Sequence, residues 1–189
     1  MPQKFDPERV KELLSNERHQ ELDPFKVMAF IPIEPYQQVA DIGCGPGFFT
    51  LPLAKYLISG KLYALDRDPK MLEILQQRVQ ESFLGNVEML KSQETRFPVE
   101  KGSLDGVLLG CVVHEVKQRL PFLKAAGALL MPKGWCAVVE WLKKETDTGP
   151  PAGERISPEE MGELAKEAGL EVREWRYLSE KYYLMLLRK

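Results

Sequence analysis

Residues 39–48 read Val-Ala-Asp-Ile-Gly-Cys-Gly-Pro-Gly-Phe, a short apolar strand followed at once by three closely spaced glycines. Glycines at the end of a strand let the backbone approach a ligand closely, and a helix that begins there offers free N–H groups to an anion. In a doubly wound sheet, ligands lie beyond the carboxyl ends of the strands, beside the first strand. This stretch therefore predicts an α/β fold with a ligand site at residues 43–47.

The segments after this loop alternate between short apolar strands and amphipathic helices, which is typical of a parallel sheet with right-handed crossovers. Five strands are expected in this part of the chain, at 39–42, 61–65, 87–90, 106–113 and 135–141. Two more, at 170–177 and 182–187, are separated by so few residues that only an antiparallel hairpin can join them. We therefore predict a doubly wound α/β fold with a seven-stranded, mostly parallel sheet and a C-terminal antiparallel hairpin.

The two ends of the alternating pattern suggest a domain division. Asp6-Pro7 and Asp23-Pro24 are helix start signals, so we expect a helical cap over residues 1–35 and one domain over residues 36–189. Residues 142–156 follow the fifth strand, and we expect either a lid over the ligand or an ordinary solvated connection there. The exposed edges of the C-terminal strand pair leave room for a homodimer.

Composition excludes several classes of protein. The 189 residues include 26 Lys plus Arg and 28 Asp plus Glu, a net charge of −2 that disfavours nucleic acid as a partner. No apolar run is long enough to span a bilayer, and the first residues lack a signal-peptide core, so we expect a cytoplasmic chain without a membrane partner. Three scattered cysteines and two histidines predict neither a disulfide framework nor a metal site.

The spacing of the glycines separates two classes of ligand. A dinucleotide fingerprint needs a third glycine where this chain has Phe48. The carboxylate of Asp41 would repel a pyrophosphate but would attract an ammonium group, as in an amino acid. Asp66 ends the second strand and can accept hydrogen bonds from both hydroxyls of a ribose, a feature that dinucleotide sites share. The implied ligand carries an amine and a carboxylate close together.

Four segments resemble the motifs of one family in their usual order. Residues 41–47 resemble motif I of the class I S-adenosylmethionine-dependent methyltransferases, and residues 65–72 resemble their post-I segment. Residues 97–116 are similar to the motif II and III region, and residues 131–134 to the turn before the fifth strand. The likeness covers roughly residues 20–189 and is nearest to the small-molecule, type 11-like group, which includes quinone-ring C-methyltransferases. It implies S-adenosylmethionine as cofactor, S-adenosylhomocysteine as product and a small-molecule acceptor.

The resemblance also implies which residues bind the cofactor. The glycine loop would line the methionine end with Asp41 near the amino group, Asp66 would bind the ribose, and two loops would flank the adenine and the sulfonium. The implied cofactor-binding residues are Asp41, Gly43, Cys44, Gly45, Gly47, Asp66, Arg67, Met71, Ser92, Gln93, Glu94, Gly110 and Cys111. The chain departs from the family at the residue that accepts from the adenine amino group, usually an Asp. Counting back from residue 97 gives Gln93, and counting forward from the strand gives Ser92.

His114 is the candidate catalytic residue, because it follows the fourth strand and an unperturbed imidazole titrates near neutral pH. It acts either as a general base or as a structural histidine that caps the strand end. Glu115 is a candidate to orient it, and Glu140 to line the acceptor pocket. The cysteines are expected to be small core residues. Two other functions stay open from the sequence: a non-catalytic S-adenosylmethionine-binding module, and a NAD-binding oxidoreductase.

Overall fold

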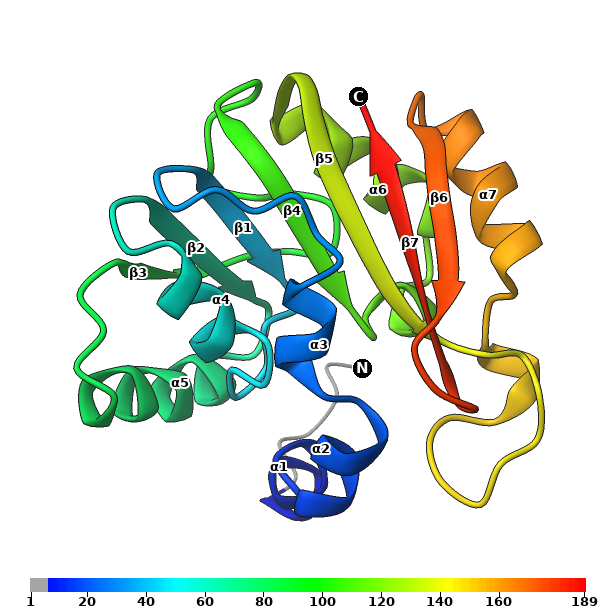
Figure 1. Ribbon diagram of the computed structural model, residues 1–189, viewed down its shortest axis with the longest axis horizontal. Coiled ribbons are helices and arrows are strands. Elements are labelled where there is room, and N and C mark those ends of the chain that lie inside the picture. The colour runs from blue at the N-terminus through cyan, green and yellow to red at the C-terminus, as the bar shows by residue number, and fades with distance from the viewer. Residues whose placement is uncertain (1–6) are drawn as a thin grey trace.

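A computed structural model describes residues 7–189 and centres on one seven-stranded sheet, in the order β3-β2-β1-β4-β5-β7-β6 (Figure 1). Strands β1 to β5 pair with one another in parallel, whereas β7 is antiparallel to both β5 and β6. The order reverses between β1 and β4, which is the switch point at which a doubly wound sheet binds its ligand. The predicted α/β fold with its C-terminal antiparallel hairpin is confirmed.

The elements have the following bounds. The strands are β1 Gln38–Ile42, β2 Lys61–Asp66, β3 Val87–Lys91, β4 Leu104–Gly110, β5 Leu130–Trp141, β6 Glu171–Tyr177 and β7 Tyr182–Arg188. The α-helices are α1 Pro7–Leu13, α2 Asn16–Glu21, α3 Pro24–Met28, α4 Thr50–Tyr56, α5 Pro69–Glu81, α6 Arg119–Leu129 and α7 Pro158–Glu167. Two short 3-10 helices, η1 Val113–Glu115 and η2 Ala152–Glu154, complete the list.

Two strand limits differ from the prediction. β4 ends at Gly110 rather than at residue 113, because Cys111 has a φ of 55° and turns the chain into η1. β5 begins at Leu130 rather than at residue 135, because Leu130 pairs with Leu104 before a register shift brings Trp135 opposite Gly106. In both places a tertiary contact decides a limit that the apolar pattern does not mark.

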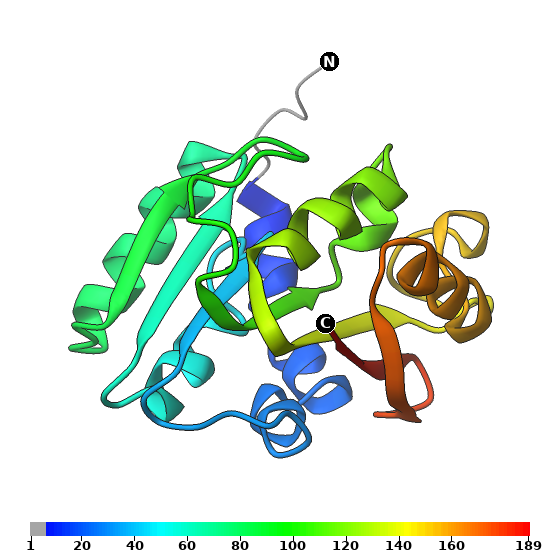
Figure 2. The ribbon, with the colours of Figure 1, turned by 90° about the horizontal axis from the view of Figure 1, so that it is seen from above.

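Helices cover both faces of the sheet. α6 and α7 lie on one side of the sheet, and α3 and α4 lie on the other (Figure 2). Buried residues of β4 and β5 face α6 and α7 on the first side, and alternate residues of the same strands face α3 and α4 on the second. α5 packs on β2 and β3 through Leu75 and Val79. The central strands are therefore apolar on both faces, as parallel strands between two helical layers must be.

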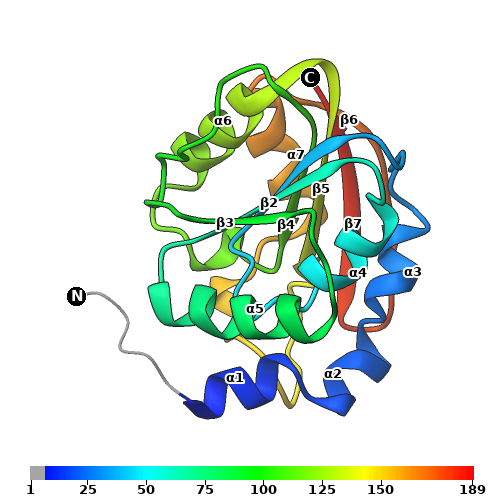
Figure 3. The same ribbon diagram turned by 90° about the vertical axis from the view of Figure 1, so that its left-hand side faces the viewer.

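The N-terminal helices lie at the end of the sheet where β1 and β4 finish (Figures 1 and 3). Asp23 caps α3 by accepting from the Phe25 N–H at 2.9 Å, as the Asp-Pro signal predicts, whereas the proposed cap Asp6 lies outside the described residues. α3 packs into the core through Val27 and Met28. None of the helices in residues 7–189 is long and apolar enough to cross a bilayer.

Candidate functional site

The glycine loop is held against the end of β2 by its own backbone. The N–H groups of Gly43 and Cys44 both donate to the Leu65 carbonyl, at 2.7 and 3.1 Å. Gly43 has a φ of 76°, and a Cβ there would lie 2.4 Å from a methyl group of Val112 in the loop after β4. The turn after β1 thus needs a glycine both for its conformation and for the close approach of the two loops.

Gly47 packs against α5, whereas the other two glycines of the loop line the cavity described below. Its φ is 92°, and a Cβ would lie 2.4 Å from Leu75 on α5. In dinucleotide-binding folds the third glycine provides such close packing of a helix. In this chain Gly47, one position earlier, allows the close packing, and Phe48 is a buried residue in the cavity wall. The packing of this loop against α5 therefore sets the position of its third glycine.

Asp66 joins the end of β2 to the glycine loop. Its Oδ2 accepts from the Gly45 N–H and its Oδ1 from the Asp68 N–H, each at 2.8 Å. Burial raises the pKa of the Asp66 carboxyl, and these two backbone hydrogen bonds partly offset the rise. Each carboxylate oxygen keeps lone pairs beyond the one that it uses, so the group can still accept from two ligand hydroxyls. Asp68 caps α5 by accepting from the Lys70 N–H.

A cavity of about 770 Å³ opens at the carboxyl ends of β1, β2, β3 and β4. Eleven of the thirteen candidate cofactor residues line it, namely Gly43, Cys44, Gly45, Asp66, Arg67, Met71, Ser92, Gln93, Glu94, Gly110 and Cys111. Aromatic side chains form much of the remaining wall, from Phe48, Phe49, Phe97 and Phe122. Cavities that hold a cofactor-sized ligand have volumes of roughly 300–1,000 Å³ and mostly apolar walls with a few polar groups.

Two candidate cofactor residues do not line this cavity. Gly47 faces α5 instead. Asp41 is 1% exposed, and its Oδ2 accepts from the Thr50 hydroxyl at 2.6 Å. Burial raises the pKa of Asp41 to about 7, the Thr50 hydrogen bond lowers it in part, and the charge of Asp66 adds to the rise. The structure thus offers no direct contact between Asp41 and a ligand in the cavity, and any influence on an ammonium group acts through its charge.

The loop after β3 brings three candidate residues to the cavity wall. Ser92 is buried, with its N–H bonded to the Asp66 carbonyl at 2.9 Å, and Gln93 forms a backbone bridge with Arg96. Glu94 accepts from the backbone N–H groups of residues 117 and 118, so its carboxylate fixes the loop after η1. Both Ser92 and Gln93 reach the wall, and either remains a candidate for the adenine amino group.

Cys111 occupies the end of β4 in a strained conformation. Its φ of 55° is uncommon for a residue other than glycine, and its N–H donates to the Val139 carbonyl at 2.8 Å. Burial raises the pKa of the Cys111 thiol to about 12, although the nearby Arg18 guanidinium opposes the rise. The thiol is therefore protonated at neutral pH, which argues against a nucleophilic role.

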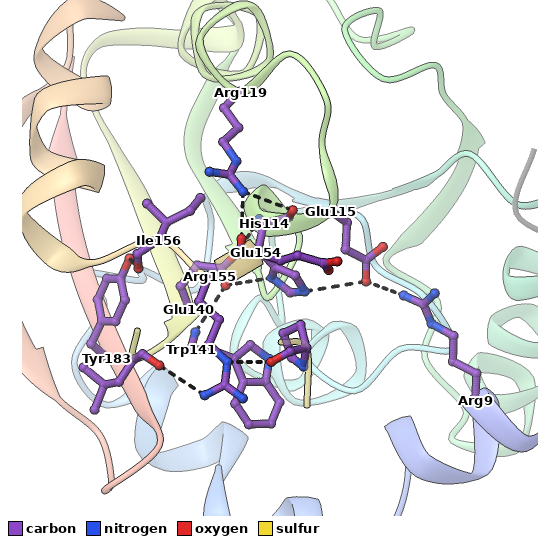
Figure 4. Close-up of polar contacts among 12 residues, drawn as sticks. Arg9, His114, Glu115, Arg119, Glu140, Trp141, Glu154, Arg155, Ile156 and Tyr183 are labelled. Carbon is purple, nitrogen blue, oxygen red and sulfur yellow. Dashed lines mark hydrogen bonds and ion pairs between the residues drawn. The ribbon is translucent and has the colours of Figure 1, made fainter. Parts of the chain in front are cut away.

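His114 is hydrogen-bonded to the buried carboxylate of Glu140 (Figure 4). Its Nδ1–H donates to Glu140 Oε2 at 2.8 Å, and its backbone N–H donates to Glu140 Oε1 at 3.2 Å. Glu140 is fully buried, so the expectation that it lines an acceptor pocket is wrong. It orients the imidazole instead, because β5 places it directly behind the turn at the end of β4.

The other imidazole nitrogen faces a second carboxylate. His114 Nε2 lies 3.9 Å from Glu115 Oε1, and Glu115 forms an ion pair with Arg9 on α1 (Figure 4). Burial opposes the charged form of His114, but the hydrogen bond to Glu140 and the nearby Glu115 outweigh it, so the pKa of His114 is raised. Glu115 lines the cavity whereas His114 does not. The imidazole is held in one orientation, with Nε2 as its free nitrogen.

Residues 142–155 are fixed by a buried arginine. Arg155 is 2% exposed and donates to the carbonyls of Pro150, Lys144 and Thr148 at 2.8, 2.7 and 3.1 Å. Its guanidinium also lies 4.9 Å from the ring of Trp141. These contacts favour the interpretation as a fixed connection over that of a mobile lid.

Two arginines of the cavity wall were missing from the prediction. Arg9 on α1 and Arg18 on α2 both line the cavity, although their helices are far from the glycine loop in the sequence. α2 is short and contains no apolar residue, so no apolar pattern marks which of its side chains face inward. In residues 7–189 no group of three or more His, Cys, Asp or Glu side chains is arranged to hold a metal ion.

Comparison with known proteins identifies the family. A methyltransferase domain family matches residues 40–138, more than half of the chain. A solved structure of a SAM dependent methyltransferase from Aquifex aeolicus has 32% sequence identity and a TM-score of 0.91, over 98% of this chain and 99% of that one. The chain belongs to the S-adenosylmethionine-dependent methyltransferase family. The matched segment of this methyltransferase contains the glycine loop, Asp66 and the end of β4.

Curated relatives of this methyltransferase share one description. A demethylmenaquinone methyltransferase of Lactococcus lactis subsp. lactis (strain IL1403) is 33% identical over 54% of this chain and 41% of its own length. Another, of Geobacillus sp. (strain WCH70), is 25% identical over 70% of this chain and 57% of its own length. The chain thus spans about half the length of these relatives.

The cavity fits S-adenosylmethionine. Asp66 presents a carboxylate with free lone pairs at the end of β2, the glycine loop leaves room for the methionine end, and Met71 and Phe97 supply apolar walls for an adenine. The dinucleotide alternative fits less well, because Phe48 and Phe49 cover the start of α4, where a pyrophosphate would bind.

We expect binding of S-adenosylhomocysteine to tighten as the pH rises through about 7, the pKa of Asp41. The ligand's ammonium group favours the ionised carboxylate, so affinity should increase at least threefold between about pH 6 and pH 8. The stability of the unliganded protein should change in the opposite direction, because the folded state binds more protons than the unfolded chain below that pKa. Calorimetric titration at several pH values measures the first effect and thermal unfolding the second.

The matched control is Asp41→Asn, which keeps the size of the side chain and removes its titration. Its affinity for S-adenosylhomocysteine should be independent of pH over this range. An equally steep pH dependence in Asp41→Asn would show that Asp41 has no influence on the ammonium group.

Proposed function

We propose that this chain transfers the methyl group of S-adenosylmethionine to a small aromatic acceptor, with a reduced naphthoquinone ring as the favoured class. The observation that carries the proposal is the cavity of about 770 Å³ at the switch point of the sheet, lined by eleven of the thirteen candidate cofactor residues. Its aromatic wall suits a flat, apolar acceptor, and the curated relatives named for demethylmenaquinone support this class.

The cofactor, when bound, supplies a methyl group on a positively charged sulfur with a good leaving group. The protein's part is then to align the acceptor with that methyl group and to exclude water. Asp66 and the glycine loop hold the cofactor, and the phenylalanine walls and the N-terminal helices close the site from water. Where the acceptor carries a proton, its proposed base is His114 Nε2, which lies behind Glu115 of the cavity wall at 3.9 Å from its Oε1, while Glu140 accepts from Nδ1–H.

The test is transfer of a labelled methyl group to 1,4-naphthoquinol, prepared from 1,4-naphthoquinone with an excess of reductant. The proposal expects label in the ring and one S-adenosylhomocysteine formed for each methyl group transferred. The oxidised quinone is the matched control and should accept no label, because its ring is not electron-rich. Binding of the cofactor without transfer to the quinol or to the simpler diphenol catechol would favour a non-catalytic binding module.

For His114 we expect that replacement by Gln lowers the maximal rate at least tenfold, since a positioned base contributes about 10²–10⁴. The base must be neutral at Nε2, so the wild-type rate should rise with pH through a pKa above the ordinary value of His. Glu140→Gln should move this rise to lower pH, because it removes the charge that stabilises the imidazolium. An unchanged maximal rate in His114→Gln would identify a structural histidine.

A homodimer also remains a proposal. β6 is the outer strand of the sheet and exposes Trp175 and Tyr177. Sedimentation of the wild type and of a Trp175→Lys variant tests it, since a dimer through this edge should dissociate in the variant.

A further inference from the structure

Arg18 on α2 lines the cavity and packs against the segment that follows the glycine loop. Its Cζ is 4.5 Å from the centroid of the Phe48 ring, and the His19 ring packs on the same phenylalanine at 4.7 Å. The charge of Arg18 acts on the Cys111 thiol after β4 and on the Tyr182 hydroxyl of β7. Arg18 is therefore placed next to the end of β4 and toward β7, away from the ribose candidate on β2.

The guanidinium of Arg18 is incompletely satisfied. Its Nε is buried and has no hydrogen-bond partner among the described residues. Two carboxylates whose charges act on the same groups as that of Arg18 are engaged elsewhere, because Glu21 pairs with Lys181 and Glu115 pairs with Arg9. Arg18 as a whole is half-buried, but its Nε–H is a buried donor without an acceptor, and such a donor destabilises the folded protein. An arginine in this state at a cavity wall is suited to an anionic oxygen of a ligand.

We propose that Arg18 binds an anionic oxygen of the methyl acceptor, and that the acceptor is a phenol, hydroquinone or enol that reacts as its conjugate base. This inference rests on the proposed function and narrows its substrate class. The acceptor's hydroxyl proton is lost first, to His114 Nε2 or to solvent. The resulting anion supplies the electron pair for the new bond to the methyl carbon, and the carbon–sulfur bond breaks with its electron pair left on sulfur, so charge balances.

Arg18 has two effects on such an acceptor. A fixed cation lowers the pKa of the bound hydroxyl and so raises the fraction of the reactive anion at neutral pH. It also discriminates against neutral ethers of the same shape, because these leave the Nε–H without an acceptor. A product whose oxygen carries no charge would therefore bind less tightly than the anionic acceptor.

The experiment uses the intact chain saturated with S-adenosylhomocysteine and two probes, 4-nitrophenol and its methyl ether 4-nitroanisole. The phenolate has its own visible absorption, so titration reports both the affinity and the pKa of the bound phenol. The wild type should bind the phenolate at least about tenfold more tightly than the ether and lower the phenol pKa. Arg18→Met should abolish the preference and the pKa shift, and Arg18→Lys should restore part of both. Arg173→Met, which removes an exposed arginine paired with Glu171 on β6, is the matched control and should behave as the wild type.

Two results would overturn the inference: a wild type that shows no preference for the phenolate, or a preference for the phenolate that survives in Arg18→Met. In the second case the affinity of Arg18→Met for S-adenosylhomocysteine is also measured, and it can be unchanged or lost. Its loss would assign Arg18 to the cofactor's carboxylate. Failure of the wild type to bind S-adenosylhomocysteine at all is a different outcome, because it contradicts the proposed function itself.

Discussion

Replacing Asp66 by alanine is expected to weaken S-adenosylhomocysteine binding by about a hundredfold, because two hydrogen bonds of roughly 1.5–3 kcal/mol each to a charged acceptor are lost. The structure adds a second reason. The same carboxylate accepts from the Gly45 N–H at 2.8 Å, so its removal also releases the glycine loop from the end of β2. Asp66→Asn keeps the shape and one acceptor oxygen, and we expect a smaller loss of about tenfold.

The matched control for Asp66 is Asp105→Asn. Asp105 also accepts from a backbone N–H, that of Gln38 at 2.8 Å, but it lies at the opposite end of the parallel strands. Its replacement should leave the dissociation constant unchanged. Calorimetric titration, with thermal unfolding to confirm that each variant is folded, makes the comparison. If Asp66→Ala binds S-adenosylhomocysteine as tightly as the wild type does, Asp66 does not bind the ribose, and the proposed placement of the cofactor is wrong.

Replacing Arg155 by methionine is expected to lower the free energy of unfolding by about 3 kcal/mol or more, since several hydrogen bonds to a charged group are lost and buried carbonyls are left unpaired. Arg155 Nη2 also donates to the Thr146 hydroxyl at 2.6 Å, and Nη1 to the Leu142 carbonyl at 3.2 Å, so both ends of the loop depend on it. Residues 142–155 should then become sensitive to protease while the sheet stays folded.

Urea denaturation and limited proteolysis measure these effects. The control is again Arg173→Met, where an exposed ion pair is worth at most about 1 kcal/mol. A change of less than about 1 kcal/mol in Arg155→Met would mean that water replaces the lost donors, and the loop would then qualify as a lid after all.

Local sequence patterns predicted most of the fold and most of the cofactor cavity. The glycines after β1, the aspartate that ends β2 and the Asp-Pro start signal at Asp23 are short-range signals, because each acts within a few residues along the chain. The strand limits at Cys111 and Leu130 escaped because tertiary contacts set them.

The functional polar contacts were harder to predict for a related reason. Glu140 and His114 are 26 residues apart and meet only because β4 and β5 are neighbours in the sheet. The sequence placed Glu140 correctly at the end of its strand but gave no indication of which way its side chain points. Arg18 and Cys111 come together only through the fold, because Arg18 lies on α2, a polar helix in which no apolar pattern marks the inward face.

The central claim is that the cavity between the glycine loop, Asp66 and Cys111 binds S-adenosylmethionine. The most direct test is isothermal titration of the purified protein with S-adenosylhomocysteine, with NAD as the control ligand. We expect micromolar binding of S-adenosylhomocysteine and no binding of NAD. Binding of NAD without S-adenosylhomocysteine would contradict it and make the glycine loop a variant dinucleotide site in spite of Phe48.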